Sequence, residues 1–230
     1  MPHRTISKSV VKRLPVYLRI LDNLIRRDIE IISSKELSNE SGFSAEQIRK
    51  DLAYFGAFGT RGTGYNTVYL RDKILKIIGL DKRTSIMVVG AGYLGTALTR
   101  YNTSKNSYVH VAAVFDKDPE LIGRYINEIP IVSLDELPRL VSLYQIKVAL
   151  LTVPAESAQE AVDAIVRHGI KAILNFAPVK LRVPADVHVF NADLTMELQG
   201  LIYYISAEEE RISRLQQEKD LKGSKTLTLE

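Results

Sequence analysis

The chain of 230 residues contains no cysteine and only four histidines, which are His3, His110, His168 and His188. The absence of cysteine excludes disulfides, thiolate zinc sites and cysteine catalysis. The histidines stand far apart and show no metal-binding spacing, so we expect no metal partner. No run approaches about 18 uninterrupted apolar residues, and the first five residues contain no apolar signal core. We therefore expect a cytoplasmic protein without a membrane partner.

Positive charge is concentrated in the N-terminal part of the chain. Residues 1–80 contain 14 lysines and arginines against 8 aspartates and glutamates, whereas the remainder contains 17 against 19. A local excess of positive charge favours binding to a polyanion through counterion release. A basic surface can also serve solubility alone, so charge by itself leaves both interpretations open.

Three helices are predicted in this basic part. Apolar residues recur at helical spacing over residues 14–25, with Pro15 in the position of a first helical turn. Two shorter helices follow, and in each a serine stands three residues before Glu36 or Gln47, the spacing of a capping box. Because a turn at Gly42 joins the two short helices, the pattern is that of a helix-turn-helix.

The third helix and the segment after it form a candidate DNA-binding surface. The helix, predicted over residues 45–54, has Ile48 and Leu52 on its apolar face. Gln47, Arg49 and Lys50 are expected among its outward positions. Four glycines follow within residues 56–64, before a β-favouring run at residues 67–70, which predicts a hairpin wing. Major-groove contacts are expected from the helix and minor-groove or phosphate contacts from the wing. The alternative is a three-helix interaction domain with a solvated basic face. The candidate residues are Ser44, Gln47, Arg49, Lys50, Tyr54, Arg61 and Gly62.

A glycine-rich turn in the second part of the chain predicts a dinucleotide site. Residues 90–95 read Gly-x-Gly-x-x-Gly after an apolar run at 85–89, and Asp116 follows the next apolar run. The helix amides after the turn would face the pyrophosphate. An ordinary strand-turn-helix is the alternative. The turn residues are Gly90, Ala91, Gly92, Tyr93, Leu94 and Gly95.

The rest of this part alternates apolar strand-like runs with helical segments. Such alternation predicts an α/β fold with a Rossmann-like, doubly wound parallel sheet. The loops at the carboxyl ends of the strands should then converge on the ligand. The expected strands are residues 86–89, 109–115, 131–132, 148–153, 172–176 and 187–190.

Asp116 bears on which dinucleotide is expected. Its carboxylate suits the ribose hydroxyls of the adenosine and would oppose a 2′-phosphate, which favours NAD(H) over NADP(H). Lys117 beside it could tolerate a phosphate and tempers that preference.

The sequence does not indicate an enzyme. Hydride transfer to a small substrate usually needs a second site with an acid, a base or a carbonyl-polarising group. The remaining length is devoted to the N-terminal part and to a helix with an apolar face after Asp193, and no carboxylate pair or nucleophile elbow is found. Two alternatives stay open: an NAD-dependent oxidoreductase with an accessory N-terminal domain, and a nucleotide- or coenzyme-A-binding adaptor.

Sequence blocks in both parts resemble the Rex family of redox-sensing transcriptional repressors, over about residues 10 to 205. The blocks are residues 48–56, 59–65, 88–95, 149–154 and 173–178. The resemblance implies a homodimer that binds an inverted-repeat operator and leaves it when NADH binds. It also places seven further residues around the NAD(H) cofactor, which are Thr152, Val153, Pro154, Asn175, Phe176, Ala177 and Pro178.

The resemblance further implies a C-terminal helix exchanged between subunits and a switch formed by Arg19, Tyr101 and Asp193. An intramolecular helix would have the same amphipathic pattern. The expected domains are a winged-helix DNA-binding domain at 1–80, an NAD(H)-binding domain at 81–191, a dimerisation helix at 192–212 and a flexible tail at 213–230.

Overall fold

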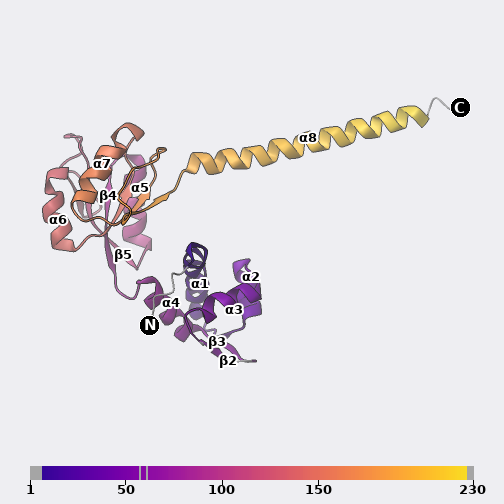
Figure 1. Cartoon of the computed structure of the whole chain (residues 1–230), viewed down its shortest axis with the longest axis horizontal. Coiled ribbons are helices and arrows are strands. Elements are labelled where there is room, and N and C mark those ends of the chain that lie inside the picture. The colour runs from indigo at the N-terminus through magenta and orange to yellow at the C-terminus, as the bar shows by residue number, and fades with distance from the viewer. Residues whose placement is uncertain (1–6, 57, 61, 227–230) are drawn as a thin grey trace. The chain divides into compact units, whose positions relative to one another are not determined.

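The structure is a computed structural model, and it describes residues 7–226 except residues 57 and 61. The chain folds as two compact units, Met1–Thr84 and Ser85–Glu230, drawn in indigo to purple and in magenta to yellow (Figure 1). The division lies close to the expected break after residue 80. Within the described residues, no helix is both long enough and apolar enough to cross a membrane.

In its described residues, the first unit contains four helices and a small antiparallel sheet. Its sheet has the strand order β1-β3-β2, and β2 and β3 form the predicted hairpin wing. This arrangement is a winged helix, as expected. The elements are α1 (Lys8–Arg26), β1 (Ile31–Ile32), α2 (Ser34–Ser41), α3 (Ala45–Ala53), β2 (Gly59–Thr60), β3 (Gly64–Asn66) and α4 (Thr67–Ile78).

The predicted caps of the two short helices are confirmed. The Ser33 hydroxyl accepts from the Glu36 amide, and the Glu36 carboxylate accepts from the Ser33 amide, so α2 begins with a complete capping box. The Ser44 hydroxyl accepts from the Gln47 amide at the start of α3. Gly42 ends α2 at φ 73°, a left-handed conformation that favours glycine.

Two predictions for this unit are wrong. Pro15 lies inside α1 rather than in its first turn, because the Ser7 hydroxyl caps the helix at the Val10 amide. Residues 67–70 open α4 instead of forming a strand. The Asn66 side chain caps that helix, and Leu70 and Ile74 are buried with helical spacing, so capping and burial override the β propensity of the run.

The second unit contains a seven-stranded sheet in the order β10-β9-β8-β4-β5-β7-β6. The pairings of β10 with β9, β9 with β8, β8 with β4 and β5 with β7 are parallel. Strand β6, which was not predicted, pairs with β7 in antiparallel fashion. The strands are β4 (Thr84–Val89), β5 (Val109–Phe115), β6 (Tyr125–Ile126), β7 (Ile129–Val132), β8 (Val148–Leu151), β9 (Ala172–Asn175) and β10 (His188–Asn191). The predicted doubly wound parallel sheet is confirmed.

Helices cover the sheet on its two faces (Figure 1). Alternate residues of β4 point to opposite faces, as the pleat requires: Met87 packs with the core under α6 and α7, and Val88 with the core that includes Leu98 of α5. The helices are α5 (Tyr93–Lys105), α6 (Leu137–Tyr144), which follows a short 3₁₀ turn η1 (Leu134–Glu136), and α7 (Ala155–Arg167).

The C-terminal helix α8 (Leu194–Thr226) is longer than expected. It was predicted to end at residue 212 before a flexible tail, but it continues to Thr226. The residues beyond 206 are mostly strong helix formers, and Arg211 and Arg214 make ion pairs with Glu208 and Glu210 one turn earlier. These local features explain the added length.

Candidate functional site

A cavity of about 790 Å³ lies at the carboxyl edge of the parallel sheet. Gly90 follows β4, Asp116 follows β5 and Thr152 follows β8, and all three line the cavity. Strand β4 lies between β5 and β8, so the chain leaves it in one direction and later returns on its other side. This is the topological switch point at which doubly wound sheets bind ligands.

The three glycines of the turn after β4 have two different roles. Gly90 adopts φ 100°, which favours glycine, and a Cβ there would lie 2.8 Å from the Thr152 carbonyl oxygen. A Cβ on Gly95 would lie 1.9 Å from the Gly90 carbonyl oxygen. By contrast, a Cβ on Gly92 would meet nothing within 4 Å. The first and third glycines therefore permit the packing of the turn, and Gly92 leaves open space at the start of α5.

The Asp116 carboxylate ties the turn to the end of β5. Its Oδ2 accepts from the Ala91 amide at 2.6 Å, and its Oδ1 accepts from the amides of Lys117 and Asp118 at 2.7 and 2.9 Å. A carboxylate has about four acceptor positions. These bonds leave Asp116 with room for roughly one more donor, such as a ligand hydroxyl.

Two further side chains hold the walls of the cavity. The Thr152 hydroxyl donates to the carbonyl oxygens of Val89 and Gly90, at 3.0 and 2.8 Å, and so joins β8 to the glycine turn. The Lys117 ammonium donates to the Ser157 hydroxyl at 2.9 Å, which links the loop after β5 to the first turn of α7. Val153 and Pro154 line the same wall.

The structure brings only part of the predicted cofactor set to this cavity. The Asn175 side chain is buried and bonds to the backbone of Ala177 and Val179 and to the side chain of Asn191, so it holds the loop after β9. The predicted residues that do not line the cavity are Ala91, Tyr93, Leu94, Gly95, Asn175, Phe176, Ala177 and Pro178. Of these, Tyr93 is almost fully exposed at the start of α5.

The cavity also extends to residues that sequence reasoning missed. They are contributed mainly by the η1–α6 segment and by one face of α7, and include Leu134, Asp135, Pro138, Glu160, Arg167 and His168. In α7, Glu160, Ala164 and Arg167 recur at helical spacing. That spacing, on a helix that starts directly after Pro154, is the signal that could have found them.

Helix α3 has the predicted division between a buried and an exposed face. Ile48 and Leu52 are buried, while Arg49 and Lys50 are exposed. Lys50 pairs with Glu46 one turn earlier at 2.7 Å, and the Arg49 guanidinium donates to the Ser34 hydroxyl at 2.9 Å.

Gln47 differs from its predicted outward position on α3. It is half-buried, and its side-chain nitrogen donates to Asp51 Oδ1 at 2.7 Å. Gln47 is therefore less exposed than its outward position on α3 predicts, and its side-chain nitrogen is occupied by Asp51. A buried acceptor one turn further along the helix draws the amide inward. Tyr54, the last of the predicted helix residues, is partly exposed and packs edge-on against Phe55.

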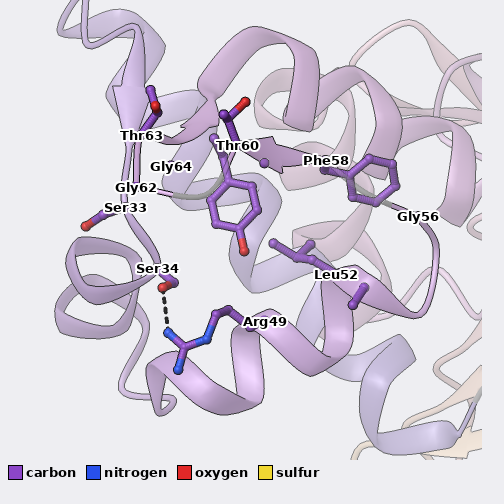
Figure 2. Close-up of a pocket in the computed structure, with 13 residues that line it drawn as sticks. Ser33, Ser34, Arg49, Leu52, Gly56, Phe58, Thr60, Gly62, Thr63 and Gly64 are labelled. Atoms are coloured by element: carbon purple, nitrogen blue, oxygen red, sulfur yellow. Dashed lines mark hydrogen bonds between the residues drawn. The ribbon is translucent and has the colours of Figure 1, made fainter.

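The wing and α3 enclose a second cavity of about 540 Å³ (Figure 2). Arg49, Gly62 and the ring of Tyr65 line it. Gly62 has φ 85° at the hairpin turn, and a Cβ there would meet nothing within 4 Å. Arg61, which was predicted to contact DNA from the wing tip, lies outside the described residues.

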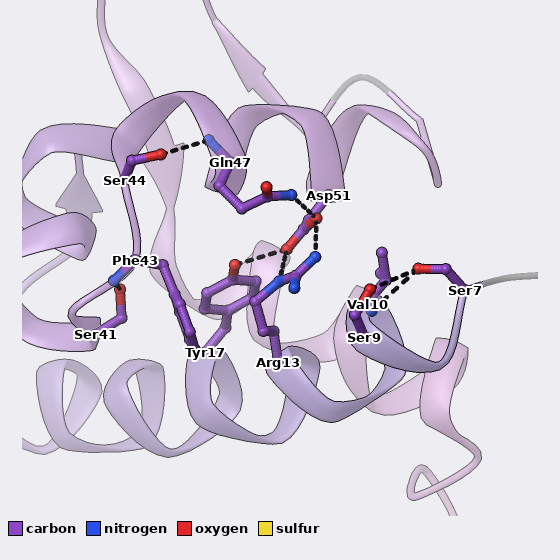
Figure 3. A network of polar contacts seen from close by, with 10 residues as sticks. All are labelled: Ser7, Ser9, Val10, Arg13, Tyr17, Ser41, Phe43, Ser44, Gln47 and Asp51. Atoms are coloured by element: carbon purple, nitrogen blue, oxygen red, sulfur yellow. Dashed lines mark hydrogen bonds and ion pairs between the residues drawn. The ribbon is translucent and has the colours of Figure 1, made fainter.

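A polar network joins α3 to α1 (Figure 3). Asp51 is 2% exposed and accepts hydrogen bonds from Arg13, Tyr17 and Gln47. Burial alone would raise the pKa of the Asp51 carboxyl, but the hydrogen bonds outweigh it and hold the pKa below the ordinary aspartate value. Burial, followed by the bond to Asp51, raises the pKa of the Tyr17 hydroxyl.

Because the pKa of Asp51 is lowered in the folded state, the network contributes stability above the unfolded pKa of 3.8 and loses it as pH falls through the folded value. We expect the first unit to lose stability below about pH 4. Thermal melts between pH 3 and 7 would measure this, with Arg13→Met/Tyr17→Phe/Asp51→Leu as the matched variant, because it removes the carboxyl together with its buried charged and hydroxyl partners. That variant should show a smaller acid-induced loss, and an identical pH dependence would contradict the prediction.

The three residues of the predicted switch belong to different units. Arg19 is exposed on α1 of the first unit, and Tyr101 is 62% exposed on α5 of the second. Asp193 caps α8, since its Oδ1 accepts from the amides of Thr195 and Met196, both at 3.0 Å.

Two family models match the chain, one in each unit. Residues 5–53 match the model described as a putative DNA-binding protein N-terminus, and residues 81–179 match the CoA binding domain.

Relatives match nearly the whole chain. A protein of Natranaerobius thermophilus named redox-sensing transcriptional repressor Rex is 58% identical over 87% of this chain and 91% of the relative. A protein of the same name from Brevibacillus brevis is 43% identical over 89% of this chain and 99% of the relative.

Solved structures are similar as well. The structure of RSP in complex with β-NAD⁺ and operator DNA has a TM-score of 0.84 at 38% identity, over 92% of this chain and 97% of RSP. RSP in complex with β-NADH has a TM-score of 0.79 at 37% identity, over 92% and 99% of the two chains.

Proposed function

This chain belongs to the Rex family of redox-sensing transcriptional repressors, and on that premise we propose that it represses transcription by binding operator DNA as a homodimer in the cytoplasm and that NADH releases it. Proteins of this family are transcriptional repressors and not enzymes. The proposed ligand of the second unit, NAD(H), is thus a signal. The oxidoreductase alternative stated above loses support for the same reason.

The observation that carries the proposal is the cavity at the switch point of the parallel sheet, joined in one chain to a winged helix. Its residues fit a dinucleotide. Gly92 leaves space at the start of α5, where helix amides can face a pyrophosphate, and Asp116 keeps an acceptor position for a ribose hydroxyl. The nicotinamide ring, once bound, would be either oxidised or reduced, and the protein would respond to the difference between these two states.

We assign the cofactor site first to the predicted residues on the cavity, which are Gly90, Gly92, Asp116, Lys117, Thr152, Val153 and Pro154. Ala91 and Gly95 support this site through the Asp116 bond and the packing of the turn. Asn175 supports it indirectly, by ordering the loop of residues 176–178.

The DNA contacts are proposed on the exposed side chains of α3 and on the wing. Within α3, which is expected to enter the major groove, we propose that Lys50 contacts a phosphate, so Lys50→Ala is expected to weaken binding to operator and to unrelated DNA to a similar extent. It should also lower the slope of log affinity against log salt by about 1, because one phosphate contact is lost. Fluorescence anisotropy at several salt concentrations would measure both quantities. Lys171→Ala, which removes an exposed lysine paired with Asp186 in the second unit, is the matched control. Equal slopes for the two variants would argue against a phosphate contact by Lys50.

Dimerisation is proposed through α8. Its apolar side chains are exposed in the single chain, and a soluble helix of this kind needs a covering surface. A second copy would cover it and set two recognition helices about one DNA turn apart, as an inverted repeat requires. The exposed residues are Leu194, Leu198, Leu201, Ile202 and Ile205.

Ligand control requires NADH to bind two forms of the dimer with different affinity. DNA must then weaken NADH binding by the factor by which NADH weakens DNA binding. A 100-fold effect corresponds to about 2.7 kcal/mol of coupling. Arg19, Tyr101 and Asp193 are proposed to favour one arrangement of the two units over the other.

Titration of an inverted-repeat operator against the full chain, at fixed NADH or NAD⁺ concentrations, tests the proposal directly. NADH should lower operator affinity by roughly 100-fold, and NAD⁺ should lower it much less. Operator affinity that does not respond to NADH would refute redox control. Steady turnover of NADH with a metabolite would instead support an oxidoreductase, and absence of sequence-selective DNA binding would support an adaptor.

A further inference from the structure

Asp51 on the recognition helix α3 is a buried carboxylate with an unusual number of partners (Figure 3). Arg13 of α1 donates twice, from Nε to Oδ2 at 2.6 Å and from Nη2 to Oδ1 at 2.8 Å. The Tyr17 hydroxyl donates to Oδ2 at 2.8 Å, and Gln47 Nε2 donates to Oδ1 at 2.7 Å. These four hydrogen bonds fill the acceptor capacity of the carboxylate.

Stability alone does not account for this network. Removing two charges from water is costly, and replacing a buried ion pair by apolar residues of similar volume is often neutral or stabilising. The surroundings are suited to apolar packing, since Phe43 packs edge-on against Tyr17 at 5.9 Å and lies under the Arg13 guanidinium at 5.8 Å. Apolar side chains could therefore hold α1 against α3.

A carboxylate does one thing here that an apolar side chain cannot, which is to orient Gln47. An ionised carboxylate only accepts hydrogen bonds, so the Gln47 amide must turn its nitrogen towards Asp51. Its oxygen Oε1 is then directed elsewhere. The backbone of Gln47 is held as well, because its amide donates to the Ser44 hydroxyl at 3.1 Å in the first turn of α3.

The N-terminal turn of a recognition helix is the part that contacts base edges in helix-turn-helix complexes. We propose that Asp51, held by Arg13 and Tyr17, is a positioning residue for base recognition. It turns the Gln47 amide so that Oε1 accepts from an exocyclic amino group, adenine N6 or cytosine N4, in the major groove. This inference rests on the proposed function as a DNA-binding repressor.

The test compares base preferences, which a purely structural network would not set. The full wild-type chain first selects its preferred duplex from a random DNA library. In Gln47→Ala, the preference for one base over the others should then fall about tenfold at one base pair in each half-site. The preferences at the other base pairs should remain. Asp51→Asn should lose preference at the same base pair, because an amide can donate as well as accept and no longer dictates the orientation of Gln47.

Asp51→Asn leaves Arg13 without its counter-charge and can unfold the first unit. The second variant is therefore Arg13→Met/Tyr17→Phe/Asp51→Leu, which replaces the buried polar groups together and leaves none without a partner. This variant is expected to melt near the wild-type temperature and to bind NADH with unchanged affinity. It should still lack the preference at the base pair affected by Gln47→Ala.

The outcomes separate the inference from the proposed function. A wild-type chain that selects no sequence would refute the proposed function itself. If the wild type selects a sequence but the triple variant retains the preference at that base pair, the network is purely structural and the inference is overturned. Unchanged preferences in Gln47→Ala would overturn it as well.

Discussion

Gly95→Ala is expected to abolish NADH binding and to lower the melting temperature of the second unit by on the order of 5–10 °C. A Cβ at this position would lie 1.9 Å from the Gly90 carbonyl oxygen and 2.7 Å from the Thr152 hydroxyl oxygen. The nearest obstacle is backbone, so the glycine turn and α5 must move apart. Overpacking of this kind costs roughly 1–3 kcal/mol or more. Calorimetry and thermal melts would measure the two effects.

Gly92→Ala is the matched control for this prediction. Gly92 has φ −66°, which any residue adopts, and a Cβ there would meet nothing within 4 Å. The melting temperature of the Gly92→Ala variant should therefore equal that of the wild type. NADH affinity should still fall at least about tenfold, because the added methyl group fills the space proposed for the pyrophosphate. If both variants bind NADH like the wild type, the cofactor does not occupy the turn.

The glycine turn and its neighbours at the carboxyl edge of the sheet could be predicted from the sequence. The Gly-x-Gly-x-x-Gly pattern after an apolar run predicted the turn, and Asp116 after the next run predicted an acceptor for the ribose hydroxyls of the ligand. Both predictions depend on local order along the chain. The strand order that brings Thr152 beside the turn could be expected from the alternation of strands and helices, since parallel strands need crossovers.

Other features depend on tertiary contacts that sequence patterns do not contain. Residues 67–70 favour a strand by propensity but begin a helix, because the Asn66 cap and the buried Leu70 and Ile74 decide the outcome. Gln47 stands on the outward side by helical spacing, yet its side-chain nitrogen donates to the buried Asp51. The donors that make Asp51 a strong acceptor come from Arg13 and Tyr17, more than 30 positions earlier in the chain.

Asp116→Ala is expected to raise the NADH dissociation constant about 30- to 100-fold, or roughly 2–3 kcal/mol. Two losses combine in this variant. The proposed acceptor of the ribose hydroxyl disappears, and the amides of Ala91, Lys117 and Asp118 lose the charged partner that joins the glycine turn to β5. Isothermal calorimetry with NADH would measure the change. Operator binding without cofactor should remain as in the wild type, because Asp116 belongs to the second unit.

Asp163→Ala is the matched control, since it removes an exposed carboxylate of α7 that does not line the cavity. Asp116→Asn separates the two losses. The asparagine side chain keeps one acceptor oxygen for a backbone amide but places a donor beside the others. The NADH dissociation constant of Asp116→Asn should therefore lie between those of the wild type and Asp116→Ala. An Asp116→Ala chain that binds NADH as tightly as Asp163→Ala would remove Asp116 from the cofactor site. If that chain also failed to leave the operator when NADH bound, Asp116 would instead transmit the ligand signal through the glycine turn.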